Sequence, residues 1–359
     1  MDLPPLALQR TRGKTAPDQR DGARLLRIRR GFALDPRELP DTLKPWEARR
    51  LVAEARIHAT AAAHEEVVLT RESALVLHGI PAWADNPDVW VRMDSRGTLR
   101  RFPAVEGENW FVPSARIRQD SRPSTDEPVV VDGITVDSLE TTAVLCALSL
   151  HPIEGFTAAC GIIRRLCGFN RFDIAESRRR EEEVRTDLLR RLHSMTVKRG
   201  AKRANVILTY ASGACESVGE AALLWYVLTV AQHDVETQVE VRADGRRYFA
   251  DIAIPALGLI LEFDGMGKLG GNEVEFARSR AAMMKRDLDL ERGGWRVAHF
   301  QMTDFAAPDA LRRRLAALVD DGGPLLDVPA AGMWAPIDSR INGNARRLQR
   351  RAAPPPPAL

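Results

Sequence analysis

Three carboxylates interrupt an apolar stretch in the second half of the chain. In RYFADIAIPALGLILEFDG, residues 247–265, Asp251, Glu262 and Asp264 stand among residues typical of buried strands. Two such runs joined by Pro-Ala-Leu-Gly predict an antiparallel hairpin. If the turn is centred on Ala256–Leu257, Asp251 lies directly opposite Glu262, and the period of two puts Asp264 on the same face as Glu262.

Two facing carboxylates indicate either a cation site or a neutralised surface pair. Unpaired, they would repel, and each would raise the pKa of the other. A divalent cation with a preference for oxygen ligands, Mg²⁺ or Mn²⁺, removes that conflict. The alternative is a solvent-facing pair neutralised by Arg246, Arg247 or Lys268. The spacing of the carboxylates alone leaves both interpretations open.

The neighbouring segments favour the cation site. Glu220 stands early in the helical run SVGEAALLWYV, and a helix packed on the sheet could deliver a third carboxylate. Lys268 follows Asp264 closely enough to hold a phosphate or a water. KRDLDLERGGWRVAHF, residues 285–300, predicts a basic helix that stops at Gly293-Gly294 and is followed by a strand.

Residues 204–315 contain three segments in the order ESVGEAALLWYVL, the acidic hairpin and GGWRVAHF. In this order they resemble the very-short-patch-repair-like endonuclease domain, which belongs to the restriction-endonuclease-like PD-(D/E)XK superfamily. The resemblance implies a mixed sheet flanked by helices. By position, Glu220 matches the helix glutamate, and Asp251 and Glu262 match the metal-binding carboxylates. Asp264 falls where many members carry the catalytic lysine.

The chain also departs from that family pattern. Lys268 stands where many members have a histidine after the Asp-Gly pair. Met283-Met284 replaces a Glu-Lys pair that relatives often carry in the later helix, and Arg286 and Asp287 follow it. The expected metal cluster is therefore intact, while the polar groups expected around it are not.

The resemblance implies metal-assisted phosphodiester hydrolysis. Asp251 and Glu262 would hold Mg²⁺ or Mn²⁺, with Glu220 or Asp264 completing the shell, and Lys268 would offset charge on the phosphate. The basic residues expected to contact flanking phosphates are Arg280, Lys285 and Arg286.

The first half of the chain carries a second resemblance. RIRRGFAL, LTRESALVLHGIP and GITVDSLETTAVLCALS are similar to the abortive-infection type IV antitoxin family (AbiEi-like), over residues 24–165. Members usually begin with a winged helix-turn-helix, but residues 1–23 are too few to supply one before the wing-like RIRRGFAL. The arginines of that segment, Arg27, Arg29 and Arg30, are candidate DNA contacts, and His78 is expected to be structural.

Bulk properties indicate a globular protein, and the two resemblances imply that its fold class is α/β. The 359 residues are 45% hydrophobic and 28% charged, the net charge is +3, and no apolar run approaches the ~20 residues needed to span a membrane. The N-terminus has no signal-peptide pattern, so a cytoplasmic location is expected. The predicted parts are a flexible N-terminus (1–23), an α+β antitoxin-like domain (24–165), a charged helical linker (166–203), the restriction-endonuclease-like domain (204–315) and a disordered basic, Pro-rich tail (321–359).

Two function classes follow from these observations. The first is a metal-dependent endonuclease that cuts DNA, in phage defence or DNA repair. The second is a non-catalytic DNA-binding regulator or antitoxin-like protein in which the nuclease fold is vestigial, with a toxin or other regulatory partner. Oligomeric state and sequence preference leave no signal in the chain.

Overall fold

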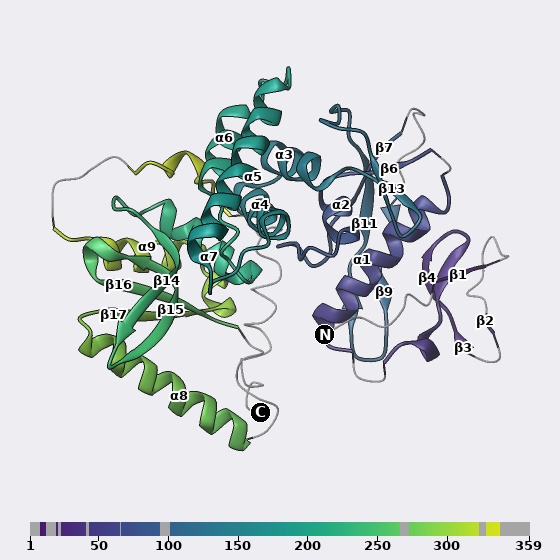
Figure 1. Cartoon of the computed structure of the whole chain (residues 1–359). Helices are drawn as coiled ribbons and strands as arrows, with labels where there is room; N and C mark the ends of the chain where they lie inside the picture. Colours follow the sequence, from purple (N-terminus) through teal and green to yellow (C-terminus); the bar gives the residue numbers. More distant parts are fainter. Residues whose placement is uncertain are drawn as a thin grey trace. The chain divides into compact units, whose positions relative to one another are not determined.

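The computed structural model describes residues 8–11, 19–20, 23–40, 43–64, 66–93, 101–265, 273–322 and 328–337. The chain divides into two compact units, Met1–Cys146 and Ala147–Leu359. Both units contain helices and strands, so the protein is mixed α/β, as the sequence predicts (Figure 1).

The first unit is built on a mixed six-stranded sheet with the order β12-β13-β6-β7-β11-β8. Its strands are β6 (Val68–Leu69), β7 (Val89–Arg92), β8 (Arg101–Phe102), β11 (Ala115–Gln119), β12 (Val129–Val131) and β13 (Ile134–Val136). The described part of this unit also contains a three-stranded sheet and two short ribbons. The three-stranded sheet has the order β1 (Leu8–Arg10), β5 (Phe32–Leu34), β4 (Leu26–Arg29). The ribbons pair β2 (Gln19–Arg20) with β3 (Ala23–Arg24), and β9 (Val105–Glu106) with β10 (Phe111–Val112).

Helix α1 (Pro45–Ala61) forms the centre of this unit, and α2 (Arg71–Leu77) is shorter. Pro45 opens α1, and the Lys44 amide donates to the Glu47 carboxylate at 2.8 Å. The sequence of residues 46–65 predicts a helix with one apolar stripe, made of Leu51, Val52, Ala55, Ala59 and Ala62. The first four are buried, whereas Ala62 caps the end of the helix and is exposed. The amphipathic pattern was therefore sufficient to locate this helix.

The segment 25–34 forms a hairpin rather than one strand. Gly31 has φ +84, and this left-handed conformation reverses the chain between β4 and β5. β1 pairs with β5, so part of the segment 1–23 expected to be flexible belongs to the sheet. The other residues of that segment lie largely outside the described ranges.

The second unit combines a four-stranded sheet with six helices among its described residues. The sheet order is β14 (Glu236–Ala243), β15 (Arg246–Ile254), β16 (Leu259–Asp264) and β17 (Arg296–Gln301), with β16 and β17 parallel and the other pairs antiparallel. The helices are α4 (Pro152–Cys167), α5 (Ile174–Ser194), α6 (Ala201–Tyr210), α7 (Val218–Leu228), α8 (Glu273–Arg292) and α9 (Pro308–Val319); α3 (Leu139–Ser149) crosses the boundary between the units.

Two tight turns of this sheet match the sequence prediction. Asp244 and Gly245 both have positive φ, 48° and 71°, which is the geometry of the expected two-residue hairpin between β14 and β15. Gly258, with φ +54, closes the turn between β15 and β16.

Different helices pack on the two faces of this sheet, α7 on one face and α8 on the other. Phe263 on β16 contacts Phe305, and a Cβ placed on Gly219 of α7 would lie 2.1 Å from the Phe263 ring, so α7 lies against this face. Ile260, on the opposite face of β16, packs with Leu290 of α8. Glu262 and Asp264 alternate with Phe263 and therefore point to the α8 side.

The division of the chain differs from the predicted boundaries. The segment 166–203 was expected to be a linker, but α5 packs against α4 and α6, and Leu188 and Leu192 are buried. The apolar side of this helix is therefore part of the second core. Within the segment 321–359 that was expected to be disordered, Met333 is buried and Trp334 stacks on Trp225, and residues 323–327 and 338–359 lie outside the described ranges.

Candidate functional site

The hairpin register is the one predicted from the sequence. Ile252 pairs with Leu261 and Ile254 with Leu259, which centres the connection on Ala256–Leu257. The paired residues end at Ile252 and Leu261, and the same register continued by one pair would bring Asp251 opposite Glu262. A register shifted by one residue would have placed one of the two carboxylates on the other face of the sheet.

Asp251 is held against the backbone of β16. Its Oδ2 accepts the Phe263 N–H at 3.0 Å, and its Oδ1 accepts the Gln238 side-chain amide at 3.4 Å. The carboxylate thus satisfies a strand amide just beyond the last backbone pair of the ladder, Ile252 with Leu261. These contacts hold the Asp251 carboxylate at the peptide that joins Glu262 to Phe263.

Glu262 is 4% exposed and forms a bidentate ion pair with Arg286 of α8. Nη2 and Nη1 of the guanidinium donate to Oε1 and Oε2 at 2.8 and 3.2 Å, and Nη2 also donates to the Phe249 carbonyl at 2.6 Å. Arg286 was expected to contact a phosphate. In the structure it neutralises Glu262, because α8 lies over this face of the sheet.

The position of α8 is fixed by further contacts with the sheet. Leu290 is fully buried, and the Tyr248 hydroxyl on β15 donates to Asp289 Oδ2 at 2.6 Å. This hydrogen bond to a carboxylate raises the pKa of Tyr248. Arg286 lies one helical turn before Asp289 and Leu290, and so it faces the same strands.

Asp264 takes part in a cluster that the sequence did not predict. His299 of β17 contacts Asp264 Oδ2 through Nδ1 at 3.1 Å and Asp287 Oδ2 through Nε2 at 3.0 Å. Both contacts are hydrogen bonds at once only when both ring nitrogens carry a proton, because a carboxylate oxygen accepts. The parallel register pairs Glu262 with His299 and so places His299 on this face, a long-range pairing that has no local signal in the sequence.

Glu220 acts as a helix-capping residue. Its carboxylate accepts the Glu216 amide at 2.7 Å and the Ser217 hydroxyl at 3.0 Å, while Ser217 Oγ accepts the Glu220 amide at 3.1 Å. Ser217 is therefore the N-cap of α7, and Glu220 returns a bond to the amide of the preceding residue instead of to that of the cap itself. Because α7 packs on the Phe263 face, the expected third carboxylate lies on a helix across the sheet from Glu262 and Arg286.

The remaining candidates of this unit are on or before α8. Lys268 lies outside the described residues. Arg280 and Lys285 are exposed on α8. Both are therefore accessible to a phosphate.

The donor chemistry of Asp251 and Glu262 fits a hard divalent cation, with one condition. In the described part of the chain, no three His, Cys, Asp or Glu side chains are grouped to hold a metal ion. A carboxylate has about four acceptor positions, and Asp251 uses two of its own. Glu262 can bind a cation only if Arg286 leaves it.

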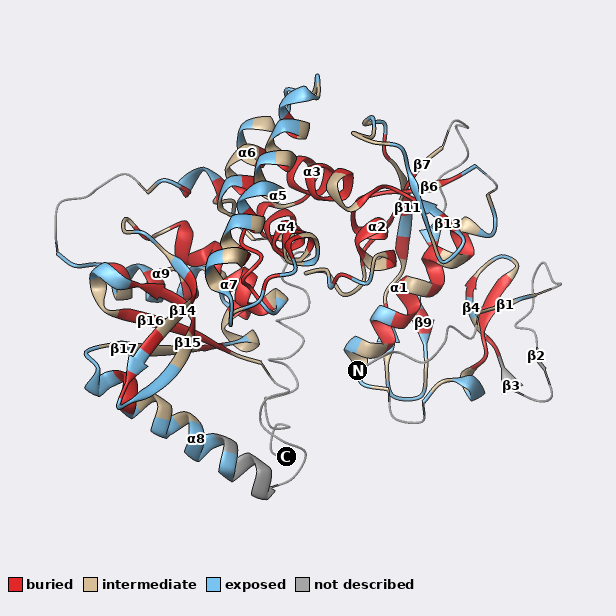
Figure 2. Cartoon of the chain, viewed as in Figure 1, coloured by how far each residue is buried: buried red, intermediate tan, exposed pale blue. Residues whose placement is uncertain are grey.

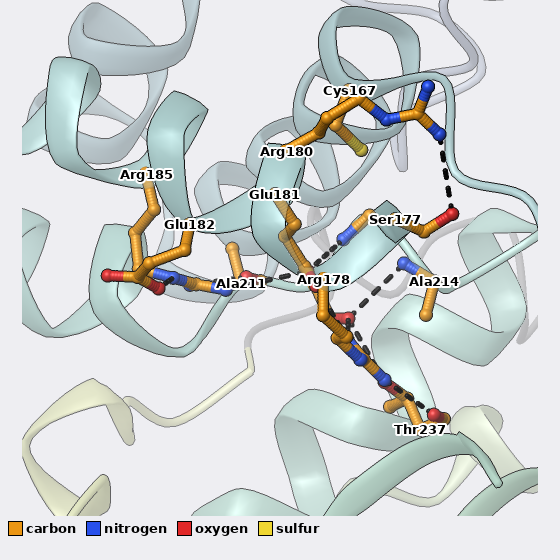
Figure 3. A network of polar contacts seen from close by, with 12 residues as sticks. Cys167, Ser177, Arg178, Arg180, Glu181, Glu182, Arg185, Ala211, Ala214 and Thr237 are labelled. Atoms are coloured by element: carbon orange, nitrogen blue, oxygen red, sulfur yellow. Dashed lines mark hydrogen bonds and ion pairs between the residues drawn. The ribbon is translucent and has the colours of Figure 1, made fainter. Parts of the chain in front are cut away.

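A buried glutamate on α5 organises the segment that leads into α7 (Figure 3). Glu181 is buried; it accepts the Gly213 amide at 2.7 Å and Arg178 Nη1 at 2.6 Å, with Arg185 Nη2 at 3.4 Å. Nη2 of Arg178 also donates to the Thr237 carbonyl at 2.6 Å, at the start of β14. Helix α5 carries blocks of opposite charge, a pattern that predicts a solvent-exposed face. Glu181 belongs to one of these blocks but lies in the core.

In the first unit, the side chain of Arg29 binds the backbone of α1, whereas Arg27 and Arg30 are exposed. Arg29 Nη1 donates to the Ala59 carbonyl at 3.3 Å near the C-terminus of α1, where a cation is favourable. Burial, followed by the charge of Arg29, lowers the pKa of His64 just beyond this helix. Arg27 and Arg30 are exposed, and His78 Nε2 contacts the Asp137 carbonyl at 2.8 Å.

Arg56, in α1, is fully buried. Its guanidinium donates to the Asn86 side chain and to the carbonyls of Pro103 and Pro113 at 2.6–2.9 Å. Burial lowers the pKa of Arg56 to about 10. This residue ties α1 to the loops around β8 and β11 and takes no part in the candidate site.

Comparisons of the chain with protein-family models, with curated proteins and with solved structures found no match. Among the described helices, none is long and apolar enough to cross a membrane.

Proposed function

We propose that the second unit hydrolyses phosphodiester bonds in DNA, with Mg²⁺ or Mn²⁺ held by Asp251 and Glu262. The observation that supports this proposal is the hairpin register, which, continued by one pair beyond Ile252 and Leu261, would bring the two carboxylates to facing positions on neighbouring strands. The order of helix, acidic hairpin, helix and strand supports it. The proposal includes a cytoplasmic location.

The chain's own groups would hold and orient the substrate. Asp251 is preorganised by the Phe263 amide, so it needs no rearrangement to present an oxygen. Arg286, once released from Glu262, lies where its guanidinium can neutralise a phosphate, and Arg280 and Lys285 are exposed further along α8. The cation, when bound, would polarise the phosphoryl group and lower the pKa of a coordinated water.

The direct test is plasmid cleavage with Mn²⁺. Supercoiled DNA is incubated with wild type, Asp251→Ala, Glu262→Gln and, as a matched control, Glu236→Gln, an exposed carboxylate on β14. We expect wild type and Glu236→Gln to nick at equal rates. Asp251→Ala and Glu262→Gln should be at least about 100 times slower, since losing a ligand costs more than the tenfold to hundredfold typical of its supporting partners. Undiminished cleavage by both variants would reject the site.

The second candidate is a DNA-binding regulator that does not cut. It is favoured by the Glu262–Arg286 ion pair, which neutralises the buried carboxylate without any metal. Calorimetric titration with Mn²⁺ separates the two. A nuclease should bind Mn²⁺ in wild type and lose that heat in Glu262→Gln, whereas the regulator should show no binding in either protein.

A further inference from the structure

An exposed aromatic side chain lies near the candidate site. Phe172, in the turn between α4 and α5, is 65% exposed. Its ring contacts Phe249 of β15 edge-on, with a centroid distance of 5.6 Å and an interplanar angle of 86°. We refer to Phe172 and Phe249 as the aromatic platform. The contact leaves most of Phe172 open to solvent.

Arginine side chains border the aromatic platform. The Arg171 guanidinium carbon lies 5.4 Å from the Phe172 centroid and 5.7 Å from that of Phe249. Arg247 lies 5.3 Å from the Phe249 centroid. The two rings are therefore bordered by cations that can also reach a phosphate.

The ion pairs around the platform contain more arginines than carboxylates. Glu216 is shared by Arg164 and Arg171, at 3.7 and 3.5 Å. Glu240 is shared by Arg242 and Arg247, at 3.2 and 3.5 Å. Four guanidinium groups thus share two carboxylates, so this surface is complementary to an anionic partner.

The turn that carries Phe172 is anchored. Asn170 Oδ1 accepts the Phe172 amide at 3.0 Å, and the Asn170 amide donates to Ser177 Oγ at 2.9 Å. Ser177 Oγ in turn donates to the Asn170 carbonyl at 3.0 Å, and Ser177 is fully buried in α5. The ring is consequently held in place before any ligand arrives, which lowers the entropic cost of binding.

The platform connects directly to the candidate site. Phe249 precedes Asp251 by two residues on β15, and its carbonyl accepts the same Arg286 nitrogen that binds Glu262. A chain stacked on Phe172 and Phe249 would therefore have its next phosphates beside Arg286.

We propose that the aromatic platform stacks an unpaired base of single-stranded DNA, with Arg171 and Arg247 on the flanking phosphates. Exposed aromatic rings with arginines bind single strands because every unpaired base has a free π-face. In a duplex these faces are covered by neighbouring bases. The binding of single-stranded DNA needs no metal ion. Only the statement that this DNA is the substrate rests on the proposed function.

Binding is measured by fluorescence anisotropy of the full chain with a labelled oligo(dT), in EDTA so that no cleavage occurs. Phe172→Ala should weaken oligo(dT) binding by about fivefold or more, the lower end of the effect of removing one stacked base. Phe172→Trp should bind as wild type does. Leu288→Ala, which removes an exposed apolar side chain from α8, is the matched control and should have no effect.

An abasic oligomer of equal length separates stacking from charge. It keeps the phosphates, so wild type should bind it as weakly as Phe172→Ala binds oligo(dT). Equal wild-type affinity for oligo(dT) and the abasic oligomer would overturn the proposal, as would an undiminished affinity of Phe172→Ala. Because the assay contains EDTA, wild type should bind oligo(dT) whether or not the protein cuts DNA, so failure of cleavage alone would leave the platform supported.

Discussion

The ion pair between Glu262 and Arg286 decides how the candidate site responds to a cation. The glutamate is almost fully buried, while the Arg286 side chain keeps 30% of its surface exposed. A buried carboxylate needs a positive partner, and either a guanidinium or a metal ion can supply it. Metal binding and the ion pair therefore compete for the same two oxygens.

This competition predicts the behaviour of Arg286→Gln. Without metal, Glu262 loses its partner, so the free energy of unfolding should fall by about 1–3 kcal/mol, less than the 3–5 kcal/mol of a fully buried pair. Mn²⁺ should restore more stability to this variant than it adds to wild type, because no ion pair has to break first. Urea unfolding in EDTA and in Mn²⁺ measures both effects.

Lys285→Gln is the control for this experiment. It removes a neighbouring exposed charge of α8 and should respond to Mn²⁺ as wild type does. If Mn²⁺ stabilised Arg286→Gln no more than wild type, Glu262 would not be a metal ligand.

The residues that could be predicted from the sequence are those whose contacts are local. Turn length and a period of two predicted the hairpin register, which the pairs from Ile254–Leu259 to Ile252–Leu261 confirm. Arg286 and His299 meet their partners through the packing of α8 and the parallel strand β17, which local patterns do not specify. For Glu220, a signal existed: Ser217 stands three residues before it, the spacing of a capping box.

At the scale of the elements, one glycine sets the distance between α7 and the sheet. Apart from Val218, the residues of α7 are buried (Figure 2). Gly219 lies over the Phe263 ring, with no room for a further carbon atom. Helix propensity and packing oppose each other here, since alanine is the better helix former by about 1 kcal/mol.

We expect packing to dominate in Gly219→Ala. The added Cβ would lie 2.1 Å from two atoms of the Phe263 ring, so the variant should lose about 1–3 kcal/mol of unfolding free energy. Gly332→Ala, where nothing lies within 4 Å, should change stability by less than about 0.5 kcal/mol. Urea denaturation compares the two variants.

A smaller residue at position 263 provides the internal check. Phe263→Leu should lower the cost of Gly219→Ala in the double variant, because the clash is specific to the ring. Strictly additive effects would mean that the ring does not set the position of α7.

Most elements of the second unit could be predicted from sequence periodicity and turn residues. The expected helix at 219–233 corresponds to α7, and the Asp-Gly turn between β14 and β15 is present. The charged helix α5 was predicted only in outline. The apolar side of this helix was predicted, but the burial of Glu181 was not. Glu181 can be buried because the Gly213 amide and two arginines bind its carboxylate. Gly213 is distant in the sequence, and the spacing of the two arginines is the same as in a surface ion pair.

At the scale of the whole molecule, each unit has a core of its own. In the first unit, Arg56 stacks on the buried ring of Phe102. In the second, Trp334 stacks on Trp225 at a centroid distance of 5.1 Å, and Arg312 lies over the Trp334 ring. Composition predicted a disordered tail from residue 321. The packing of Met333 and Trp334 could not be predicted from the Pro and Gly content of this segment, because it depends on contacts with residues far away in the sequence, such as Trp225 of α7.

Two core substitutions should therefore have separate effects. Trp334→Ala should remove about 2–4 kcal/mol from the second unit, and Phe102→Ala a similar amount from the first. Hydrogen exchange followed by mass spectrometry should show faster exchange in α4 and α7 for Trp334→Ala, with α1 and β7 unchanged, and the reverse for Phe102→Ala. Phe102 belongs to the first unit and Trp334 to the second, so each substitution is expected to act on its own unit. Faster exchange throughout the chain in either variant would show that the two units unfold as one, and the ordering of the candidate site would then depend on the first unit as well.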